Sequence, residues 1–193
     1  MVTNYSTQKD TEKSKSGLVI KSNNLINMQT DLNLIQLKIF TKIILETVKN
    51  PNKEFYRFSI AQLMKDLNIT DSNYSTLKRA TKNMFKVVVL KTKDRETQLV
   101  LFTKVDYQDW MVDMYLHPDL KPYILDIKQR YTKYFFKNIT WLNSIYSMRI
   151  YELLKEYEFR HKRSFEINEF RFLLNIDEWK YLRFTDFKKR ILL

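Results

Sequence analysis

Apolar side chains recur at helical spacing through residues 33–49, and the face they occupy is wide enough for a core helix. The apolar positions are Leu34, Leu37, Ile43, Ile44 and Val48. Asp31 or Asn33 can cap the first turn, because a short polar side chain accepts hydrogen bonds from its unpaired N–H groups. The sequence therefore predicts a long helix that ends before Pro51.

A strand and two short helices are predicted next. Residues 55–60 alternate and are rich in aromatic side chains, which favours a strand. Ser59 can then cap a helix that reaches about Leu67, and residues 68–70 form a turn. Asp71 or Ser72 can cap a second helix to about residue 85, with Tyr74, Leu77, Met84 and Phe85 as its buried stripe. Two helices separated by so short a turn have the layout of a helix-turn-helix.

The pattern then becomes β-like. Residues 87–91, 98–105 and 111–116 are strand candidates, and a charged turn lies at residues 93–96. A strand pair after a helix-turn-helix is the wing of a winged helix, which a three-helix domain lacks. The sequence therefore predicts a winged-helix domain here.

The second half of the chain repeats this order of elements. Helices are predicted over residues 123–133 and 142–160, followed by a strand at 164–167. Asn168 can cap a helix to about residue 174, residues 175–177 make a turn, and a last helix begins at Leu182 or Thr185. Leu67-Asn68-Ile69 and Leu174-Asn175-Ile176 are the closest parallel between the halves. We interpret the halves as a degenerate internal repeat.

The amino-acid composition indicates what kind of partner the protein binds. The 193 residues carry 34 Lys and Arg against 22 Asp and Glu, a formal net charge of +12, so either an acidic membrane or nucleic acid could be the partner. No stretch is long and apolar enough for a membrane span, residues 1–17 are polar and predicted to form a flexible arm, and cysteine is absent. We expect a cytoplasmic protein with a nucleic-acid partner and no membrane partner. A basic but inert surface is the alternative.

The sequence lacks the residues that phosphate-binding loops and histidine metal sites require. Gly17 is the single glycine, so a phosphate-cradling loop is excluded. His117 and His161 are far apart, so we expect no metal site, no cofactor and no small-molecule substrate. The carboxylates are scattered, which leaves a two-metal nuclease open without supporting one. We predict a protein that is not an enzyme.

Several segments resemble the iteron-type plasmid replication initiators, the Rep proteins. They are VIKSNNL at residues 19–25, YSTLKRA at 74–80, LF at 101–102, VDY at 105–107, LNSIYSMRIYELL at 142–154 and FKKRIL at 187–192. The resemblance covers nearly everything after residue 18, and the segment at 142–154 is the most specific. It looks like the helix that opens the second domain of the family.

The resemblance implies an α+β fold of two tandem winged-helix domains. Residues 18–138 would form the first domain, for dimerisation and contact with the DNA backbone. Residues 139–193 would form a second domain for DNA recognition, incomplete because the sequence stops before its wing. Dimers of such initiators tend to repress their own gene, while monomers bind the origin repeats. The β elements at 87–116 are the expected dimer surface.

Candidate DNA-binding residues lie on both predicted recognition helices. Lys78, Lys82 and Lys86 share i, i+4 spacing and, with Arg79, would form a basic ridge, although a solvated helix face is the alternative. On the second helix we expect Lys188, Lys189 and Arg190 in the groove or on phosphates, Arg183 on a phosphate, and Thr185 near the helix start. Arg149 could instead be a structural ion-pair partner, and most aromatic residues follow core periodicity rather than a single-strand stacking pattern.

The sequence-based hypothesis is a sequence-specific double-stranded DNA-binding initiator of plasmid replication. Its partners would be origin repeats (iterons), a second copy in a homodimer, and the host initiator and helicase. The alternative is a winged-helix transcriptional repressor with no replication role. A third interpretation, a nuclease or primase, is opposed by the missing histidine pair and glycine-rich loops.

Overall fold

The computed structural model describes residues 17–70, 74–82, 84–91, 95–126, 130–177 and 179–192. The expected flexible arm lies outside these residues, apart from Gly17. The helices are α2 Asn23–Ile26, α3 Leu34–Lys49, α4 Ile60–Asp66, α5 Tyr74–Lys82, η1 Pro118–Leu120, α6 Lys121–Leu125, α7 Lys137–Thr140, α8 Ile145–Lys155, η2 Glu158–Arg160, α9 Ile167–Leu173, α10 Phe184–Phe187 and η3 Lys188–Leu192. The strands are β1 Leu18–Ser22, β2 Gln29–Thr30, β3 Tyr56–Ser59, β4 Val87–Lys91, β5 Glu96–Val100, β6 Phe102–Gln108, β7 Met111–Leu116 and β8 Tyr131–Phe135.

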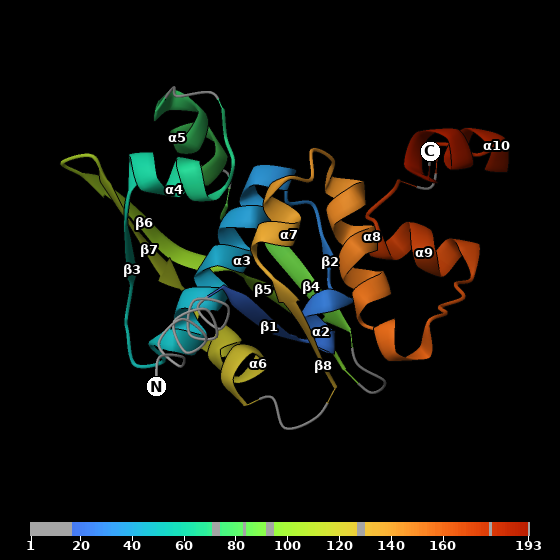
Figure 1. Ribbon diagram of the computed structural model, residues 1–193, viewed down its shortest axis with the longest axis horizontal. Helices are drawn as coiled ribbons and strands as arrows, with labels where there is room; N and C mark the ends of the chain where they lie inside the picture. The colour runs from blue at the N-terminus through green and yellow to red at the C-terminus, as the bar shows by residue number, and fades with distance from the viewer. Residues whose placement is uncertain are drawn as a thin grey trace, which may run out of the picture.

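Helix α3 crosses the middle of the molecule, as Figure 1 shows, and confirms the predicted long core helix. Asn33 is its cap: the Asn33 Oδ1 accepts from the Gln36 N–H at 3.0 Å, and the Gln36 Oε1 accepts from the Asn33 N–H at 2.8 Å. This reciprocal capping box fixes the start of the helix. Leu37, Phe40 and Ile43 are fully buried, so α3 is the element on which the rest of the first domain packs.

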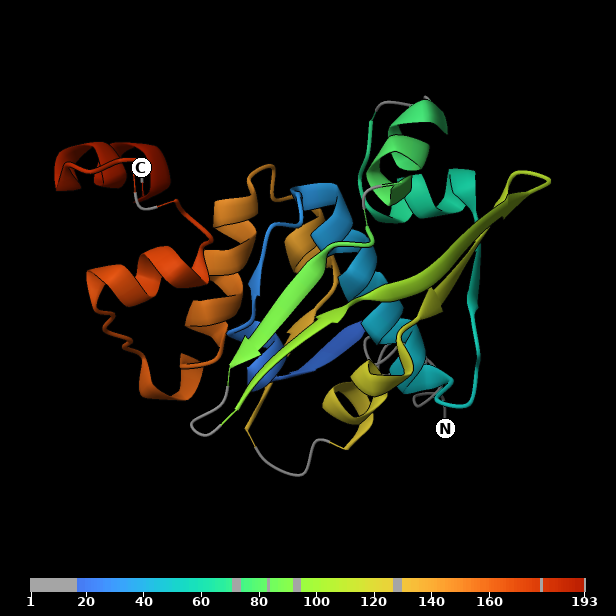
Figure 2. The same ribbon diagram turned by 180° about the vertical axis from the view of Figure 1, so that it is seen from behind.

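The described strands form three small antiparallel sheets, with orders β1–β8, β2–β4–β5 and β3–β7–β6. The third sheet joins the strand before the two short helices to a later hairpin, which is the topology of a winged helix. Its wing is therefore β6–β7, the hairpin that projects from the body in Figure 2. The strand pair β4–β5, which directly follows the helices, belongs to another sheet and is not the wing.

The predicted single strand at residues 98–105 is two strands, β5 and β6. They are separated at Leu101, which is fully buried and whose carbonyl accepts the His117 N–H at 2.9 Å. The chain passes here from the sheet of β4 into the sheet of β7. A local pattern cannot show this change of partner, because strand-forming residues on either side of Leu101 do not indicate which strand each segment pairs with.

The predicted helix at residues 123–133 is wrong over its second half. Helix α6 ends at Leu125, and Tyr131 begins strand β8, while Ile127 lies outside the described residues. Thr132 and Tyr134 are buried in β8, and the residues between and beside them are exposed, which is the alternation of a half-buried strand. Pairing with β1 along its whole length determines this structure.

Helix α8 is shorter than the predicted helix at 142–160. The Ser144 side chain caps it and accepts from the Tyr146 N–H at 3.2 Å, and a separate turn, η2, follows it. Met148 and Leu153 of α8 are fully buried, whereas Leu154 is 51% exposed. Phe85, predicted in the buried stripe of the second short helix, is also exposed, because α5 ends at Lys82 before reaching it.

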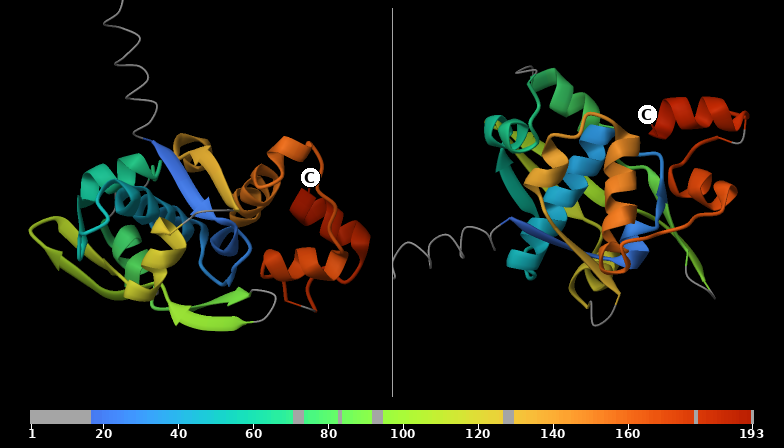
Figure 3. Two further views of the ribbon diagram at one scale, coloured as in Figure 1. Left: turned by 90° about the horizontal axis from the view of Figure 1, so that it is seen from below. Right: turned by 45° about the vertical axis from the view of Figure 1, so that its right-hand side comes forward.

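The final elements α9, α10 and η3 lie at the end of the molecule away from the β6–β7 hairpin, as Figure 3 shows. Residues 164–166 form no strand, and the α9 cap is Glu166 rather than Asn168. The last helix exists, begins after Arg183 and continues as the π-helical turn η3. Ile191 of η3 is 9% exposed and belongs to the hydrophobic core. None of the described helices is both long and apolar enough to span a bilayer.

Candidate nucleic-acid interface

The turn between α4 and α5 is set by Asn68, which has φ of 53°. The Asn68 N–H donates to the Lys65 carbonyl at 3.1 Å, and the Ile69 N–H donates to the Met64 carbonyl at 2.9 Å. This pair of bonds is a Schellman motif, in which an asparagine replaces the usual glycine in the left-handed position. It ends α4 at a fixed place and directs the chain toward α5.

Helix α5 is held against α3 and the wing. Leu77 is fully buried, and the Gln36 Nε2 donates to the Ala80 carbonyl at 2.8 Å. The Thr81 hydroxyl bonds the Tyr107 hydroxyl of β6. Burial raises the pKa of Tyr107, which outweighs the opposite effect of this hydrogen bond, so the phenol stays neutral near pH 7. The position of α5 is therefore fixed from two sides.

The opposite face of α5 carries exposed cations. Lys78, Arg79 and Lys82 are all exposed, and none of them forms an ion pair with another described residue. The Lys78 Nζ lies 5.8 Å from the centroid of the Tyr74 ring. These side chains are free to meet phosphates.

Lys86 is not part of this ridge. Helix α5 ends at Lys82, so the i, i+4 series does not extend to residue 86. The Lys86 Nζ lies 3.0 Å from the Asp31 Oδ2 and also donates to the Asp31 carbonyl at 3.0 Å. Its charge is therefore matched by Asp31 in a partly exposed ion pair.

The wing adds an exposed aromatic residue that the sequence analysis did not single out. Asp109 and Trp110 form the β6–β7 turn with φ of 49° and 63°. Two left-handed residues in succession are what a two-residue hairpin turn requires. Trp110 is 76% exposed, and its ring lies edge-on to that of Tyr74 with centroids 5.7 Å apart. The only signal in the sequence was the position of Asp109 and Trp110 between the strand candidates at residues 98–105 and 111–116.

The second unit repeats the first. Asn175 has φ of 52°, its N–H donates to the Phe172 carbonyl, and the Ile176 N–H donates to the Arg171 carbonyl at 2.9 Å. Arg171, also not singled out from the sequence, binds the following loop through the carbonyls of Asp177, Lys180 and Tyr181. Phe187 is buried against Phe170, with ring centroids 6.0 Å apart.

All five candidate residues of this second unit are exposed. They are Arg183 at the cap of α10, Thr185 within it, and Lys188, Lys189 and Arg190 in η3. In Figures 1 and 2, α5 and α10 lie along the same upper edge of the molecule. The helices that carry the two predicted cationic sets therefore lie along one edge of the molecule, and Lys86 is the candidate that lies outside them.

Arg149 is buried and cannot contact DNA from this position. It is 2% exposed, its guanidinium donates to the carbonyls of Met28 at 2.8 Å and Leu173 at 3.2 Å, and it pairs with Glu152 at 3.4 Å. The structural interpretation of Arg149 is confirmed. Because Leu173 ends α9, the same side chain links α9 to Met28, which precedes β2.

Glu152 also pairs with Lys21 of β1 at 2.6 Å and accepts a hydrogen bond from the Tyr134 hydroxyl. Burial alone would raise the pKa of Glu152. The charges of Lys21 and Arg149, with hydrogen bonds from Lys21 and Tyr134, outweigh that effect and hold the pKa below its usual value. Glu152 is therefore an ionised, fully satisfied core carboxylate.

Comparison with known proteins identifies the family of this chain. Residues 18–155 match the family described as Initiator Replication protein, WH1. The chain belongs to this replication initiator family. It is 26% identical over 174 residues to a replication initiation protein of Escherichia coli, an alignment that covers 83% of this chain and 55% of the relative. The chain thus spans about half the length of that curated relative.

A solved structure has the same fold. It is the Pi initiator protein in complex with iteron DNA, which superposes with a TM-score of 0.68 at 19% identity. The superposition covers 92% of this chain and 83% of the other. The mixed helix and strand architecture of the initiator winged-helix fold is therefore confirmed. At 19% identity, this similarity is evidence for the fold only.

Proposed function

We propose that this chain binds double-stranded origin repeats in a sequence-specific manner and so initiates plasmid replication. The observation that carries the proposal is that α5 and α10, which lie along one edge of the molecule (Figure 1), and η3, which follows α10, carry exposed cations. A single duplex lying along that edge would meet both. Membership of the initiator family, and the iterons bound by the similarly folded Pi initiator, support this choice of DNA.

The two units would divide the task. We assign residues 18–138 to the DNA backbone, through Lys78, Arg79 and Lys82, because lysines on a helix face neutralise phosphates without reading sequence. We assign residues 139–193 to recognition, with Lys188, Lys189 and Arg190 at the groove and Arg183 and Thr185 near the phosphates. Lys86 is the weakest member of the set, because Asp31 already neutralises it.

The action we propose is binding rather than catalysis. The single glycine and the two distant histidines do not supply the usual phosphate-cradling or nicking sites. The described residues also hold no group of three or more His, Cys, Asp or Glu that could bind a metal ion. Opening of the origin would then depend on the host initiator and helicase, which the bound protein recruits.

We further infer a homodimer through the strands at residues 87–116. Strand β5 pairs with β4 on one side and is the outer strand of the sheet β2–β4–β5. An outer strand offers unpaired backbone groups to a second copy. Light scattering over a range of protein concentrations tests this, and Gln98→Lys should lower the dimer fraction because it adds a positive charge to that edge strand.

A competition assay tests the proposed function. Labelled duplex carrying the origin repeats is bound at fixed salt, and unlabelled repeat or scrambled duplex is added as competitor. We expect the repeat to compete far better than the scrambled duplex, whereas equal competition would refute sequence-specific binding. A winged-helix repressor without a replication role remains the second candidate. It would bind its own promoter but fail to support replication of a plasmid that carries only the repeats.

A further inference from the structure

A groove lies on the side of the molecule away from both candidate recognition helices. Its larger part is a hollow of about 790 Å³ between α2, β8 and the end of α8. These elements lie at the lower side of Figure 1, while α5 and α10 lie at the upper edge. A duplex bound along the upper edge would leave this hollow open.

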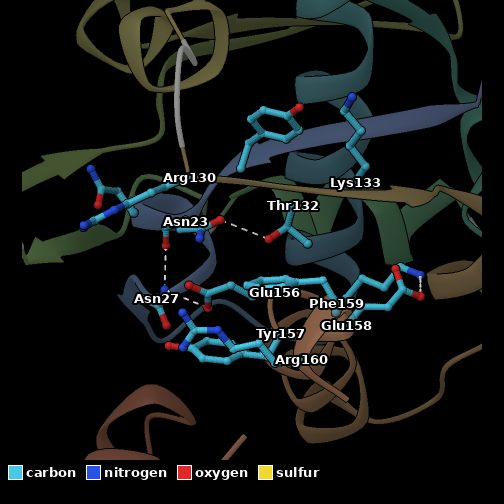
Figure 4. Close-up of a pocket in the computed structure, with 13 residues that line it drawn as sticks. Asn23, Asn27, Arg130, Thr132, Lys133, Glu156, Tyr157, Glu158, Phe159 and Arg160 are labelled. Atoms are coloured by element: carbon cyan, nitrogen blue, oxygen red, sulfur yellow. Dashed lines mark hydrogen bonds and ion pairs between the residues drawn. The ribbon is translucent and has the colours of Figure 1, made fainter. Parts of the chain in front are cut away.

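The floor of the hollow is a closed polar network. The Asn27 Nδ2 donates to the Glu156 Oε2 at 3.1 Å and to the Asn23 carbonyl at 2.8 Å, and the Asn27 Oδ1 accepts from Arg163 at 3.1 Å. Arg163, whose side chain is only 7% exposed, pairs with Glu156 at 2.6 Å. Figure 4 shows Asn23, Asn27 and Glu156 linked in this way. The carboxylate on the floor is therefore neutralised by the protein itself.

The rim is cationic. Arg130 and Lys133 stand on the β8 side, Arg160 stands on the η2 side, and all three are exposed (Figure 4). None of the three forms an ion pair with another described residue. Glu158, the other carboxylate of the hollow, is paired with Lys155. The unmatched charge of the lining is therefore positive, and it would attract an anionic ligand.

The groove also presents apolar surface. A second hollow of about 620 Å³ adjoins the first and shares Lys155, Tyr157 and Glu158 with it. Phe159 of the first hollow is 74% exposed, and Leu154 of the second is 51% exposed. Two joined hollows, each with an exposed apolar side chain and cations around them, suit an extended chain better than a compact small molecule.

We propose that this groove binds an acidic protein segment in which carboxylates alternate with apolar side chains. The carboxylates would pair with Arg130 and Arg160, and the apolar side chains would cover Phe159 and Leu154. A second DNA duplex fits less well, because a phosphate backbone has no apolar groups to cover these residues. The proposal does not rest on the DNA-binding function and concerns a separate face of the molecule.

The test uses a labelled peptide of alternating glutamate and leucine, followed by fluorescence anisotropy with the full chain. Arg130→Glu and Arg160→Glu should each weaken peptide binding by about fivefold, the size expected for one exposed charge contact. Lys53→Glu, an equally exposed charge reversal outside the groove, should change nothing. A peptide with glutamine in place of glutamate should bind far more weakly. Equal binding by the glutamine peptide, or equal loss in all three variants, overturns the proposal.

The same variants separate this proposal from DNA binding. Peptide and non-specific duplex should bind together, because they occupy opposite sides, and Arg130→Glu should leave duplex binding unchanged. If Arg130→Glu and Arg160→Glu instead weaken duplex binding as much as Lys82→Glu does, the groove is a second DNA surface and the peptide proposal is wrong. Thermal melting of each variant confirms that the fold is retained.

Discussion

Asn68 and Asn175 hold the same position in two copies of one structural unit. Each is the left-handed residue that follows a short helix, with φ of 53° and 52°. Each is flanked by a buried leucine and a mostly buried isoleucine, and each N–H donates three residues back along the chain. The degenerate repeat seen in the sequence is therefore a repeat of a helix ending, which fixes where α4 and α9 stop.

The left-handed backbone at these two positions predicts a stability pattern. Asn68→Ala should lower the free energy of unfolding by about 1 kcal/mol, because a Cβ-bearing residue without a local polar side chain is disfavoured there. Asn68→Gly should be neutral or slightly stabilising. Asn175→Ala and Asn175→Gly should behave alike, and urea denaturation measures all four. Equal losses for alanine and glycine at either site would show that side-chain contacts, not φ, decide the preference.

This repeat shows what a local pattern can reveal. The residues Leu-Asn-Ile, the spacing of α3 and the alternation of residues 55–60 are all local, and each predicted its element correctly. The core positions Leu37 and Leu77 followed from helical periodicity. Local periodicity suffices where an element buries one face against a neighbour close in sequence.

The predictions that the sequence could not decide concern residues whose contacts lie far away along the chain. Residues 131–135 fit a helical spacing almost as well as an alternating one, and only pairing with β1, at the other end of the chain, makes them a strand. For Arg149 the sequence left two roles open, and the carbonyls of Met28 and Leu173, both distant in the sequence, decide for the structural one. Lys86 was predicted in the basic ridge but does not belong to it, because α5 ends at Lys82 and Lys86 pairs with Asp31. None of these contacts has a signature in the neighbouring residues.

Glu152 predicts a dependence of stability on pH. Its pKa in the folded protein lies below the usual value of about 4.3, so ionised Glu152 stabilises the fold above that pH, and the contribution is lost as pH falls through the folded pKa. Glu152→Gln leaves Lys21 and Arg149 without their carboxylate and should cost about 3 kcal/mol at pH 7. The difference from the unsubstituted protein should shrink as pH falls below about 4.

Urea denaturation at pH 7 and at acid pH measures this difference. Glu158→Gln is the matched control, because Glu158 pairs with Lys155 while its side chain is 64% exposed. The control should cost less than about 1 kcal/mol and show little change with pH. A Glu152→Gln penalty that stays constant down to acid pH would contradict the assignment of Glu152 as an ionised core group.

The cations of α5 predict a change in salt dependence. Lys82 is exposed and unpaired among the described residues, so Lys82→Ala should reduce the slope of log affinity against log salt for a non-specific duplex by about 0.9. Lys86→Ala is the matched control from the same basic segment, and it should leave the slope unchanged because Lys86 is held by Asp31. Identical slopes for the two variants would remove α5 from the DNA surface.

We expect Arg190 to be a residue that reads the DNA sequence. It is the one arginine of η3, beside Lys188 and Lys189, and all three are exposed. A guanidinium can donate two parallel hydrogen bonds to a guanine edge, whereas a lysine acts as a point charge that suits phosphates. Arg190→Ala should therefore cost about 1–3 kcal/mol on the origin repeat and much less on a scrambled duplex.

Two further variants separate the geometry of Arg190 from its charge. Arg190→Lys keeps the charge but lacks the planar fork, so it should retain affinity for scrambled duplex while losing most of the preference for the repeat. Lys188→Ala should weaken binding to both duplexes by the same factor, because a phosphate contact carries no sequence information. Competition titrations at one fixed salt concentration give the specificity ratio of each variant. If Arg190→Ala lowers affinity for both duplexes equally, Arg190 is a phosphate contact, and base reading must pass to other exposed residues of the second unit, with Arg183 the first to test.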